Sequence, residues 1–368
     1  MKEQPFKKRR VGVLMGGLSR EREISLKTGK AVLKALVDKG YNAYPIDVGP
    51  DIAEVLFKEK IECAFVALHG RYGEDGTVQG MLELMGIPYT GSGVLASALA
   101  MHKTMSKKIL LFEKIPTPAY EVFGRGEIER DPLRPLLLPL PVVVKPAREG
   151  STIGISIVRT KDDLVPALRE AAGYDEEILV EEFVTGKEIT VGILGDIPLP
   201  IIEIVPKSGF YDYHSKYTKG ETQYIIPARI PREKYLYAQE IGLKAFRSLG
   251  CSGCARVDLM TDEGGNPFVI DVNTMPGMTE TSLLPQAAAF AGIAFEELVE
   301  RILLGAALKI EGGRPRVERR PGGNHASSPS INHREDKGTK PSQESFKWKT
   351  DSRRRKVDRG IWKVEGSR

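Results

Sequence analysis

The sequence predicts an α/β protein whose amino-terminal part is a doubly wound parallel sheet. Strand-like and helix-like segments alternate through the first 95 residues, and the connections between them are short. This alternation is typical of parallel strands joined by crossover helices. Gly16-Gly17 and His69-Gly70 follow two of the apolar runs. Because functional loops of such sheets gather at the carboxyl ends of the strands, these two turns are candidate site elements.

The bulk composition indicates a globular protein with several domains. The chain has 368 residues, of which 41% are hydrophobic and 28% are charged. That length is sufficient for two or three domains with their own cores. No apolar run approaches the roughly 20 residues of a membrane span. The amino-terminal VGVLMGG is too short for a signal-peptide core, so we expect a cytoplasmic protein.

The charge is distributed unevenly along the chain. Residues 311–368 hold 16 Lys and Arg against 8 Asp and Glu, whereas the rest holds 38 against 41. The body is therefore near neutral, and nucleic-acid binding by it is not indicated. The basic, Ser-, Gly- and Pro-rich tail predicts disorder. Its alternative is weak contact with an anionic surface through residues 353–356, with Trp348 and Trp362 nearby.

The first segment contains a buried strand, an amphipathic helix and further strands. RVGVLMGG is the strand, and SREREISLKTGKAVLKALVDKG is a helix closed by Gly40. The strands YNAYPIDV and CAFVALHG, a helix over about residues 77–85 and IPYTG follow. The glycines do not form G-x-G-x-x-G, and Glu21 stands where a pyrophosphate would lie. This pattern argues against NAD and suits a ligand with a cationic group.

The middle and final segments alternate less regularly. A helix is predicted over residues 97–115, and prolines exclude regular structure before the strand PVVVKPA. The loop REGSTIGIS, a helix near residues 161–173, one strand over residues 177–194 and PIIEIVP follow. Beyond an irregular polar stretch at residues 207–224, we expect a helix over residues 233–249, two strands around Asp258 and Asp271, and a final helix that ends near Leu308.

The cysteines and two of the histidines indicate structural rather than chemical roles. Cys251 and Cys254 form a single C-x-x-C, which cannot supply four ligands to zinc. Cys63 lies in an apolar run. His102 is interpreted as a surface residue, and His214 is not expected to be a ligand.

The segments CARVDLM and PFVIDVN flank a Gly264-Gly265 pair and predict a β-hairpin. With the turn at these glycines, Asp258 lies opposite Asp271 and Arg256 opposite Asn273; a longer turn would keep the same alternation. One face then carries these four polar residues. The other face carries Ala255, Val257, Leu259, Phe268, Ile270 and Val272.

The opposed carboxylates predict a metal site. Two unpaired carboxylates about 5 Å apart repel each other, and either a proton or a cation must relieve the repulsion. Oxygen ligands without His or Cys suit Mg²⁺ or Mn²⁺, which also bind phosphate oxygens. Arg256 beside them is suited to a phosphoryl oxygen. The alternative is a salt-bridged hairpin on the surface.

Other residues predict a nucleotide site. Lys145 lies in a strand flanked by prolines, and a buried lysine can act as a point charge for phosphate. REGSTIG has the small residues and backbone N–H groups of a loop that covers phosphates. VEEFV is an apolar strand with two glutamates, which suits backbone bonds to adenine and an acid near ribose.

Taken together, the motifs resemble the D-alanine–D-alanine ligases of the ATP-grasp superfamily over about residues 10–308. They are GGLSREREISL, ALHGRYGEDGTVQGMLELMGIPYTGSG, VVVKPAREGSTIG, YDYHSKYTKGETQY, RVDLM and DVNTMPGMTETSLLP, in that family's order and spacing. The resemblance implies a Rossmann-like substrate domain at residues 1–95 and ATP-grasp subdomains at 96–186 and 187–310, the latter with the metal site. The tail at 311–368 has no counterpart in the family.

The resemblance implies that ATP phosphorylates one D-alanine and that the amine of a second D-alanine attacks the acyl phosphate, with Mg²⁺ (two ions) or Mn²⁺ bound. The implied product is D-alanyl-D-alanine, for peptidoglycan precursors, made by a homodimer. The implied ATP contacts are Lys103, Lys145, Ser151, Glu181, Glu182, Phe183, Val184, Glu188, Phe210 and Lys216. The implied metal ligands are Asp258, Asp271 and Asn273. The implied D-alanine contacts are Glu21 (ammonium), His69 and Ser282 (carboxylates). The implied catalytic residues are Arg256 and the N–H of Gly277 at the oxyanion, with Glu21, Ser151 and Tyr217 as a hydrogen-bonded triad.

Several alternatives stay open at this point. His69 is equally well explained as a structural histidine, and Tyr217 as a packing residue. In the family, Tyr at the latter position accompanies a D-amino acid acceptor, which favours D-alanine over D-lactate. Another carboxylate–amine ligase, D-Ala–D-Ser included, a nucleotide-binding protein without catalysis, and a tail-tethered enzyme are the competing hypotheses. Asp271 departs from the family's usual Glu, so we expect a backbone shift toward the metals or a weaker second Mg²⁺.

Overall fold

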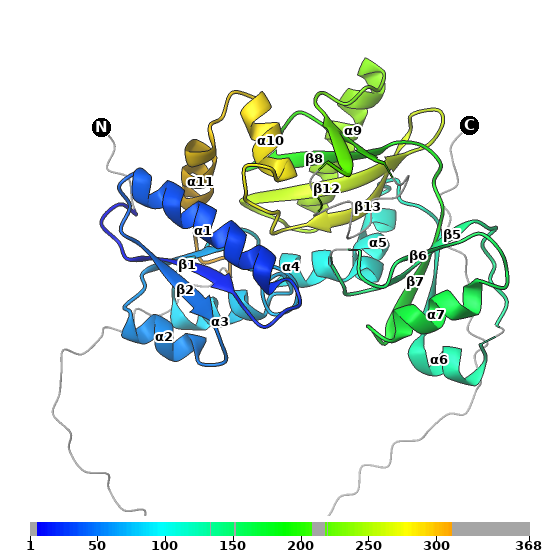
Figure 1. Ribbon diagram of the computed structural model, residues 1–368, viewed down its shortest axis with the longest axis horizontal. Coiled ribbons are helices and arrows are strands. Elements are labelled where there is room, and N and C mark those ends of the chain that lie inside the picture. Colours follow the sequence, from blue (N-terminus) through cyan, green and yellow to red (C-terminus); the bar gives the residue numbers. More distant parts are fainter. Residues whose placement is uncertain (1–5, 133, 151, 208–217, 219, 311–368) are drawn as a thin grey trace, which may run out of the picture. The chain divides into compact units, whose positions relative to one another are not determined.

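A three-stranded parallel sheet forms the amino-terminal part of the fold (Figure 1). Its order is β2 (Ala43–Val48), β1 (Val11–Gly16) and β3 (Cys63–Val66). Helices α1 (Arg22–Asp38) and α11 (Phe295–Leu304) cover one face, on which Val13 lies. Helices α2 (Ile52–Lys58) and α3 (Thr77–Met85) cover the other face, on which Leu14 lies. The predicted doubly wound sheet is confirmed, although α2 was not predicted.

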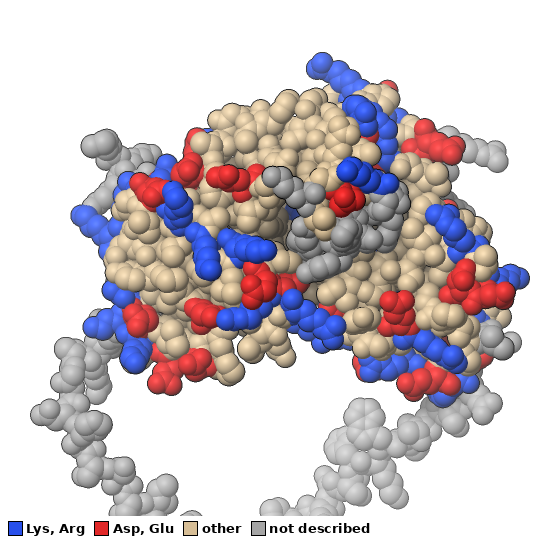
Figure 2. Space-filling model, in the orientation of Figure 1, with Lys and Arg blue, Asp and Glu red and all other residues tan. Residues whose placement is uncertain are grey.

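This computed structural model describes residues 6–132, 134–150, 152–207, 218 and 220–310, which all belong to one compact unit. The tail at residues 311–368, with its predicted disorder and surface contact, lies outside the described residues. The predicted domain boundaries at 95/96 and 186/187 stay predictions. Acidic and basic side chains are interspersed over the face shown in Figure 2. Within the described residues, no helix has the length and apolar character needed to span a membrane.

The helix predicted over residues 97–115 is two helices. Helix α4 (Val94–Met101) ends at His102, whose backbone is extended at φ −92° and ψ 90°, and α5 (Lys103–Phe112) begins directly after it. The N–H of Lys103 donates to Ala147 O at 2.9 Å, because the chain after strand β5 (Val142–Pro146) meets the start of α5 there. His102 is half-buried rather than a surface residue, and burial lowers the pKa of its imidazole.

A four-stranded antiparallel sheet follows, in the order β4 (Tyr120–Gly124), β7 (Glu177–Glu182), β5 and β6 (Ser156–Val158). Helices α6 (Arg125–Arg130) and α7 (Leu164–Ala172) pack on it through Ile128 and Leu168. The prolines before β5 lie outside helices and strands, as predicted. Strand β4 and helix α6 were not predicted, since both precede the proline-rich stretch that dominates the local pattern.

The strand predicted over residues 177–194 is also two elements. Strand β7 belongs to the four-stranded sheet, whereas β8 (Glu188–Leu194) is central in the next one. Five residues, 183–187, connect the two sheets. The local sequence does not show where one strand ends and the next begins, because the apolar pattern continues on both sides of Gly186.

The larger sheet contains six strands within the described residues. Its order is β11 (Thr222–Ile225), β10 (Ile202–Pro206), β8, β12 (Cys254–Thr261) and β13 (Pro267–Asn273), and β9 (Ile197–Pro198) pairs with β8. Helix α9 (Arg232–Ser248) covers one face, and α10 (Leu283–Phe290) contacts β8. The single final helix predicted to end near Leu308 is instead α10 and α11, of which α11 ends at Leu304.

The β12–β13 hairpin confirms the predicted pairing of the polar residues. Arg256 pairs with Asn273, and Asp258 pairs with Asp271. The turn is longer than the glycine pair, because Gly265 N donates to Asp262 O at 2.9 Å and Asp262 N donates to Asn266 O at 3.0 Å.

A bulge next to Asp271 corrects the predicted apolar face. Leu259 pairs with Val269, so Ile270 is an extra residue on β13. Val269 therefore joins Leu259 in the core, and Ile270 lines a pocket. Phe268 pairs with Met260, which lines the same pocket. The assignment of Ile270 and Phe268 to the core face was wrong.

Substitution of Gly186 tests how closely the connection between the two sheets packs. An added Cβ would lie 1.9 Å from the backbone oxygen of Thr261. We expect Gly186→Ala to lower the free energy of unfolding by about 1–3 kcal/mol, because backbone must move. Gly126→Ala, whose Cβ meets nothing within 4 Å, is the matched control. Denaturant unfolding measures both, and equal stability of the two variants would contradict the packing described here.

Candidate functional site

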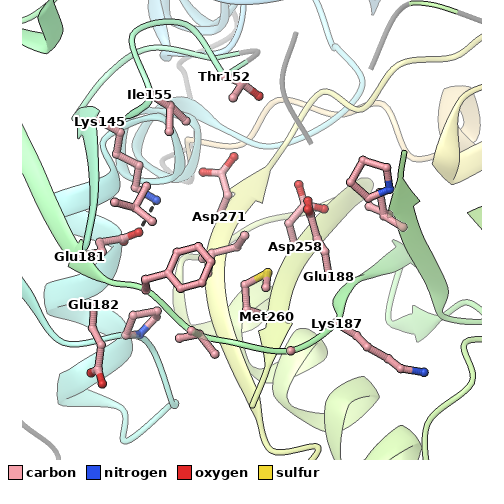
Figure 3. A pocket seen from close by; sticks show the side chains of 18 of the residues that line it. Lys145, Thr152, Ile155, Glu181, Glu182, Lys187, Glu188, Asp258, Met260 and Asp271 are labelled. Carbon is pink, nitrogen blue, oxygen red and sulfur yellow. Dashed lines mark ion pairs between the residues drawn. The ribbon is translucent and has the colours of Figure 1, made fainter. Parts of the chain in front are cut away.

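A pocket of about 450 Å³ lies between the four-stranded and six-stranded sheets (Figure 3). Strands β5, β10, β12 and β13 and the β7–β8 connection form its walls. We call it the intersheet pocket. It brings together all the predicted nucleotide residues that the structure describes: Lys103, Lys145, Glu181, Glu182, Phe183, Val184 and Glu188, with Asp258 and Asp271.

The wall formed by the four-stranded sheet holds a buried carboxylate between two lysines. Lys145 Nζ lies 2.5 Å from Glu181 Oε2, and Lys107 Nζ lies 2.9 Å from Glu181 Oε1. Burial alone would raise the pKa of Glu181, but the two ammonium groups outweigh it and hold this pKa below its usual value. Both carboxylate oxygens of Glu181 therefore contact lysines.

The opposite wall holds the two hairpin carboxylates. Arg256 binds Asp258 with two hydrogen bonds of 2.8 Å, and Thr190 Oγ1 donates to Asp258 Oδ1 at 2.6 Å. Lys103 Nζ lies 3.6 Å from Asp271 Oδ1. Figure 3 shows Asp258, Asp271 and Glu188 facing the same part of the pocket.

The hairpin supplies only part of a metal site. No group of three or more His, Cys, Asp and Glu in the described part of the chain is arranged to hold a metal ion. Asn273 Oδ1 accepts a hydrogen bond from Met275 N at 2.8 Å, which leaves its second lone pair. A cation at Asp258 and Asp271 would therefore need further oxygens, and phosphate groups in the pocket could supply them.

A second pocket, of about 500 Å³, adjoins the first. We call it the polar pocket. Lys103, Gly150 and Asp271 line both pockets, so a ligand in one would meet a ligand in the other at these residues. The polar pocket brings together the remaining described site predictions: Glu21, His69, Arg256, Asn273, Gly277 and Ser282.

Glu21 and His69 are held by the turns that follow β1 and β3. An added Cβ on Gly70 or on Gly150 would lie 2.7 or 3.0 Å from Glu21 Oε2, so this carboxylate lies between the two glycines. His69 is 6% exposed, and its ring nitrogens lie 3.1 Å from Thr28 Oγ1 and 3.3 Å from Glu74 Oε1. His69 thus lines the pocket while protein partners hold both nitrogens.

Gly277 and Ser282 face the polar pocket from the loop before α10. An added Cβ on Gly277 would lie 2.9 Å from Ser282 Oγ, so a side chain there would displace the serine. Ser282 precedes the first turn of α10, where unpaired N–H groups favour a carboxylate.

Comparison with known proteins identifies the family. The model of the D-ala D-ala ligase C-terminus matches residues 111–304, and that of the N-terminus matches residues 51–92. A D-alanine–D-alanine ligase of Syntrophotalea carbinolica is 54% identical over 309 residues, which cover 84% of this chain and 100% of the relative. The chain belongs to the D-alanine–D-alanine ligase family.

Solved structures of this family share the fold. The ATP complex of the D-alanine–D-alanine ligase from Bacillus anthracis is 36% identical with a TM-score of 0.70, over 81% of this chain and 97% of that one. The VanG D-Ala:D-Ser ligase from Enterococcus faecalis is 30% identical with a TM-score of 0.68, over 80% and 98%. The ATP-grasp fold predicted by resemblance is confirmed.

Four predicted site residues of this family member lie outside the described residues: Ser151, Phe210, Lys216 and Tyr217. The triad of Glu21, Ser151 and Tyr217 is therefore described only at Glu21, beside Gly150. Their roles stay predictions.

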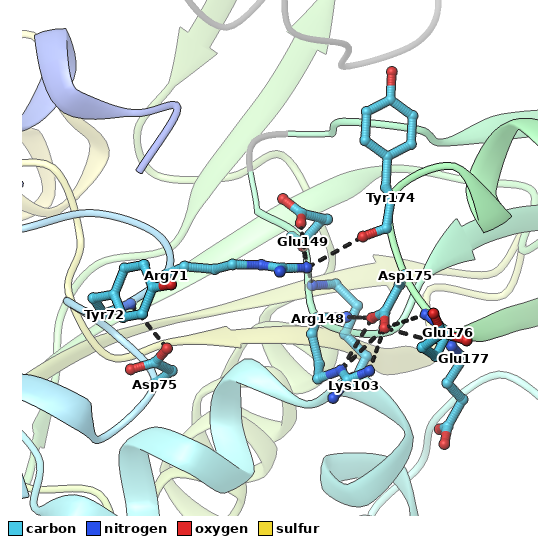
Figure 4. Close-up of polar contacts among 10 residues, drawn as sticks. All are labelled: Arg71, Tyr72, Asp75, Lys103, Arg148, Glu149, Tyr174, Asp175, Glu176 and Glu177. Atoms are coloured by element: carbon cyan, nitrogen blue, oxygen red, sulfur yellow. Dashed lines mark hydrogen bonds and ion pairs between the residues drawn. The ribbon is translucent and has the colours of Figure 1, made fainter. Parts of the chain in front are cut away.

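The sequence did not predict Arg71, which links the turn after β3 to the loop after β5 (Figure 4). It follows Gly70 and lies 2.8 Å from Glu149 Oε1, and it donates to Tyr174 O at 3.2 Å. Lys103 Nζ also donates to Glu149 O, at 2.8 Å. Arg71 thus fixes the loop that carries Gly150. In the sequence, only the position of Arg71 within the motif HGRYGEDG could have indicated that this residue has a role at the site.

Removal of this ion pair should affect ATP use more than stability. We expect Arg71→Gln to raise KM for ATP about three- to tenfold, as expected for a loss of about 1 kcal/mol of positioning. Arg125→Gln is the matched control, because Arg125 pairs with exposed Glu176 at 2.6 Å and does not touch the loop. Steady-state kinetics would contradict the assignment if both variants showed the same KM for ATP.

Proposed function

We propose that this protein joins two D-alanine molecules to D-alanyl-D-alanine with consumption of ATP, for peptidoglycan precursors. The observation that carries the proposal is the meeting of the two pockets at Lys103 and Asp271. One pocket suits a nucleotide and the other suits small zwitterions. Membership of the D-alanine–D-alanine ligase family supports the same reaction.

In the intersheet pocket, Lys103 and Lys145 would hold ATP phosphates. Residues 181–184 and Glu188 would contact adenine and ribose. Asp258, Asp271 and Asn273 would hold two Mg²⁺ or Mn²⁺ ions, for which their oxygen-only ligand set is suited. Such ions, when bound, neutralise charge on the phosphate oxygens.

In the polar pocket, Glu21 would bind the ammonium of the first D-alanine, with His69 near its carboxylate. That carboxylate would attack the γ-phosphoryl group of ATP, and ADP would leave. The amine of the second D-alanine, whose carboxylate Ser282 would hold, would then attack the carbonyl carbon of the acyl phosphate. Arg256 and the N–H of Gly277 would stabilise the developing oxyanion until phosphate leaves.

The family also suggests a homodimer working in the cytoplasm, which we propose on that ground alone. Tyr217, on which the choice of D-alanine rather than D-lactate depends, lies outside the described residues. The likeness to the VanG structure makes D-serine the alternative acceptor to test.

Phosphate release with D-alanine as sole amino acid tests the reaction. We expect release that requires ATP, Mg²⁺ and D-alanine together, because each occupies part of the joined pockets. D-Serine and D-lactate, each added with a limiting amount of D-alanine near neutral pH, are the comparison. Absence of D-alanine-dependent release would contradict the proposal, and faster turnover with D-serine or D-lactate would correct the acceptor.

The Asp271→Glu variant tests the effect of having Asp at position 271, where the family usually has Glu. The longer side chain reaches farther from β13, which a group shared between two ions requires. We expect the Mg²⁺ concentration for half-maximal rate to fall about two- to fivefold, equivalent to less than 1 kcal/mol. If neither rate nor Mg²⁺ dependence changes, the shorter side chain is a neutral variation.

A further inference from the structure

Lys107 is a buried cation outside the predicted site. It lies on α5, one turn after Lys103, and only 2% of its surface is exposed. Removal of an ammonium group from water is strongly unfavourable unless charged and polar partners replace the lost water. A lysine kept at such a position therefore needs specific partners.

Three partners surround its ammonium group. Lys107 Nζ donates to Thr117 Oγ1 at 2.6 Å and to Pro118 O at 2.9 Å, and lies 2.9 Å from Glu181 Oε1. These three oxygens match the three N–H donors of a charged lysine. Burial lowers the pKa of Lys107 to about 8, although Glu181 raises it.

Two of these partners lead to opposite walls of the intersheet pocket. Glu181 contacts Lys145 on the four-stranded sheet at 2.5 Å. Thr117 Oγ1 donates to Val269 O at 2.7 Å, on β13 of the other sheet. Val269 N in turn donates to Pro116 O at 2.8 Å. Val269 adjoins the bulged Ile270, and Asp271 follows.

The net charge of the cluster formed by Lys107, Glu181 and Lys145 affects the attraction of the pocket for phosphate. Two lysines and one carboxylate leave one net positive charge beside the pocket. Without Lys107, Glu181 would neutralise Lys145 alone, and the attraction for phosphate would fall. Lys107 therefore contributes both a charge and a connection between the walls.

We propose that Lys107 is a positioning residue that leaves the Lys145–Glu181 cluster with a net positive charge and holds Lys145 in register with the Asp271 strand. It acts through Glu181 on one side and through Thr117 on the other, without touching the nucleotide. This inference rests on the proposed use of ATP. In this proposal, helix α5 holds the phosphate-binding and metal-binding groups at a fixed separation.

Binding without D-alanine separates this role from general stability. For Lys107→Met we expect affinity for a non-hydrolysable ATP analogue with Mg²⁺ to fall about tenfold or more, and adenosine affinity to stay within about twofold. The reason is that the change removes charge beside the phosphates and leaves the adenine wall in place. Isothermal calorimetry measures both, and thermal unfolding checks the fold.

Lys108→Met is the matched control, because Lys108 is the next residue of α5 and is exposed. We expect it to bind both ligands as the unaltered protein does. The proposal is overturned if Lys107→Met weakens ATP analogue and adenosine equally, or if Lys108→Met has the same effect as Lys107→Met.

Thr117→Val tests the second connection and remains informative if Lys107→Met fails to fold. It removes the hydrogen bonds of Thr117 with Lys107 and Val269 and keeps the charges. We expect the Mg²⁺-dependent gain in analogue affinity to shrink about threefold, with metal-free binding unchanged. Unchanged Mg²⁺ dependence overturns the link to β13. Since these are binding measurements, a ligation assay that fails while they succeed contradicts the proposed reaction alone.

Discussion

The opposition of Asp258 and Asp271 on one rung of the hairpin constrains the rest of the site. Two carboxylates so placed destabilise the fold unless cations lie close to them. Arg256 neutralises Asp258 through paired hydrogen bonds, and Lys103 approaches Asp271. Glu188 faces the same part of the intersheet pocket (Figure 3), so among the described side chains three carboxylates meet two cationic groups there, and divalent ions with phosphates would complete the balance. The two pockets meet at this point, which supports the proposed reaction between a nucleotide and an amino acid.

The opposite wall also brings two like charges close together, but there the two like charges are positive and the group between them is negative. There one carboxylate, Glu181, lies between Lys107 and Lys145. The excess positive charge of this wall faces the three carboxylates Asp258, Asp271 and Glu188 across the pocket. A polyanion with bound cations fits between such walls, because each wall attracts one of its components. Thr117 joins the walls through the core, so the separation of the two charge clusters depends on buried hydrogen bonds as well as on the connection between the sheets.

The local sequence pattern predicted the elements whose conformation depends on residues that are close together in the sequence. The helical periodicity around Val32 predicted α1, and the alternation in RVDLM and FVIDVN, together with a glycine turn, predicted the pairing of Asp258 with Asp271. Family motifs supplied the predicted site residues that line both pockets. The break at His102, the division at Gly186 and the bulge at Ile270 were missed. Each depends on a segment distant in sequence: Ala147 meets Lys103, Thr261 meets Gly186, and Pro116 meets Val269. Lys107 was missed for the same reason. A lysine in a predicted helix is expected to be exposed, and the segments that bury this one are distant in sequence.

Manganese binding tests the central claim most directly, because it reports the charge balance at the hairpin without relying on turnover. Electron paramagnetic resonance counts bound Mn²⁺ as it is added to the protein with a non-hydrolysable ATP analogue. From the proposed function we expect two bound ions with the nucleotide, and loss of at least one in Asp271→Asn. The control is Asp196→Asn, whose aspartate pairs with Arg247 on the surface. Equal Mn²⁺ binding by Asp271→Asn and the unaltered protein would contradict the claim that the opposed carboxylates form the metal site.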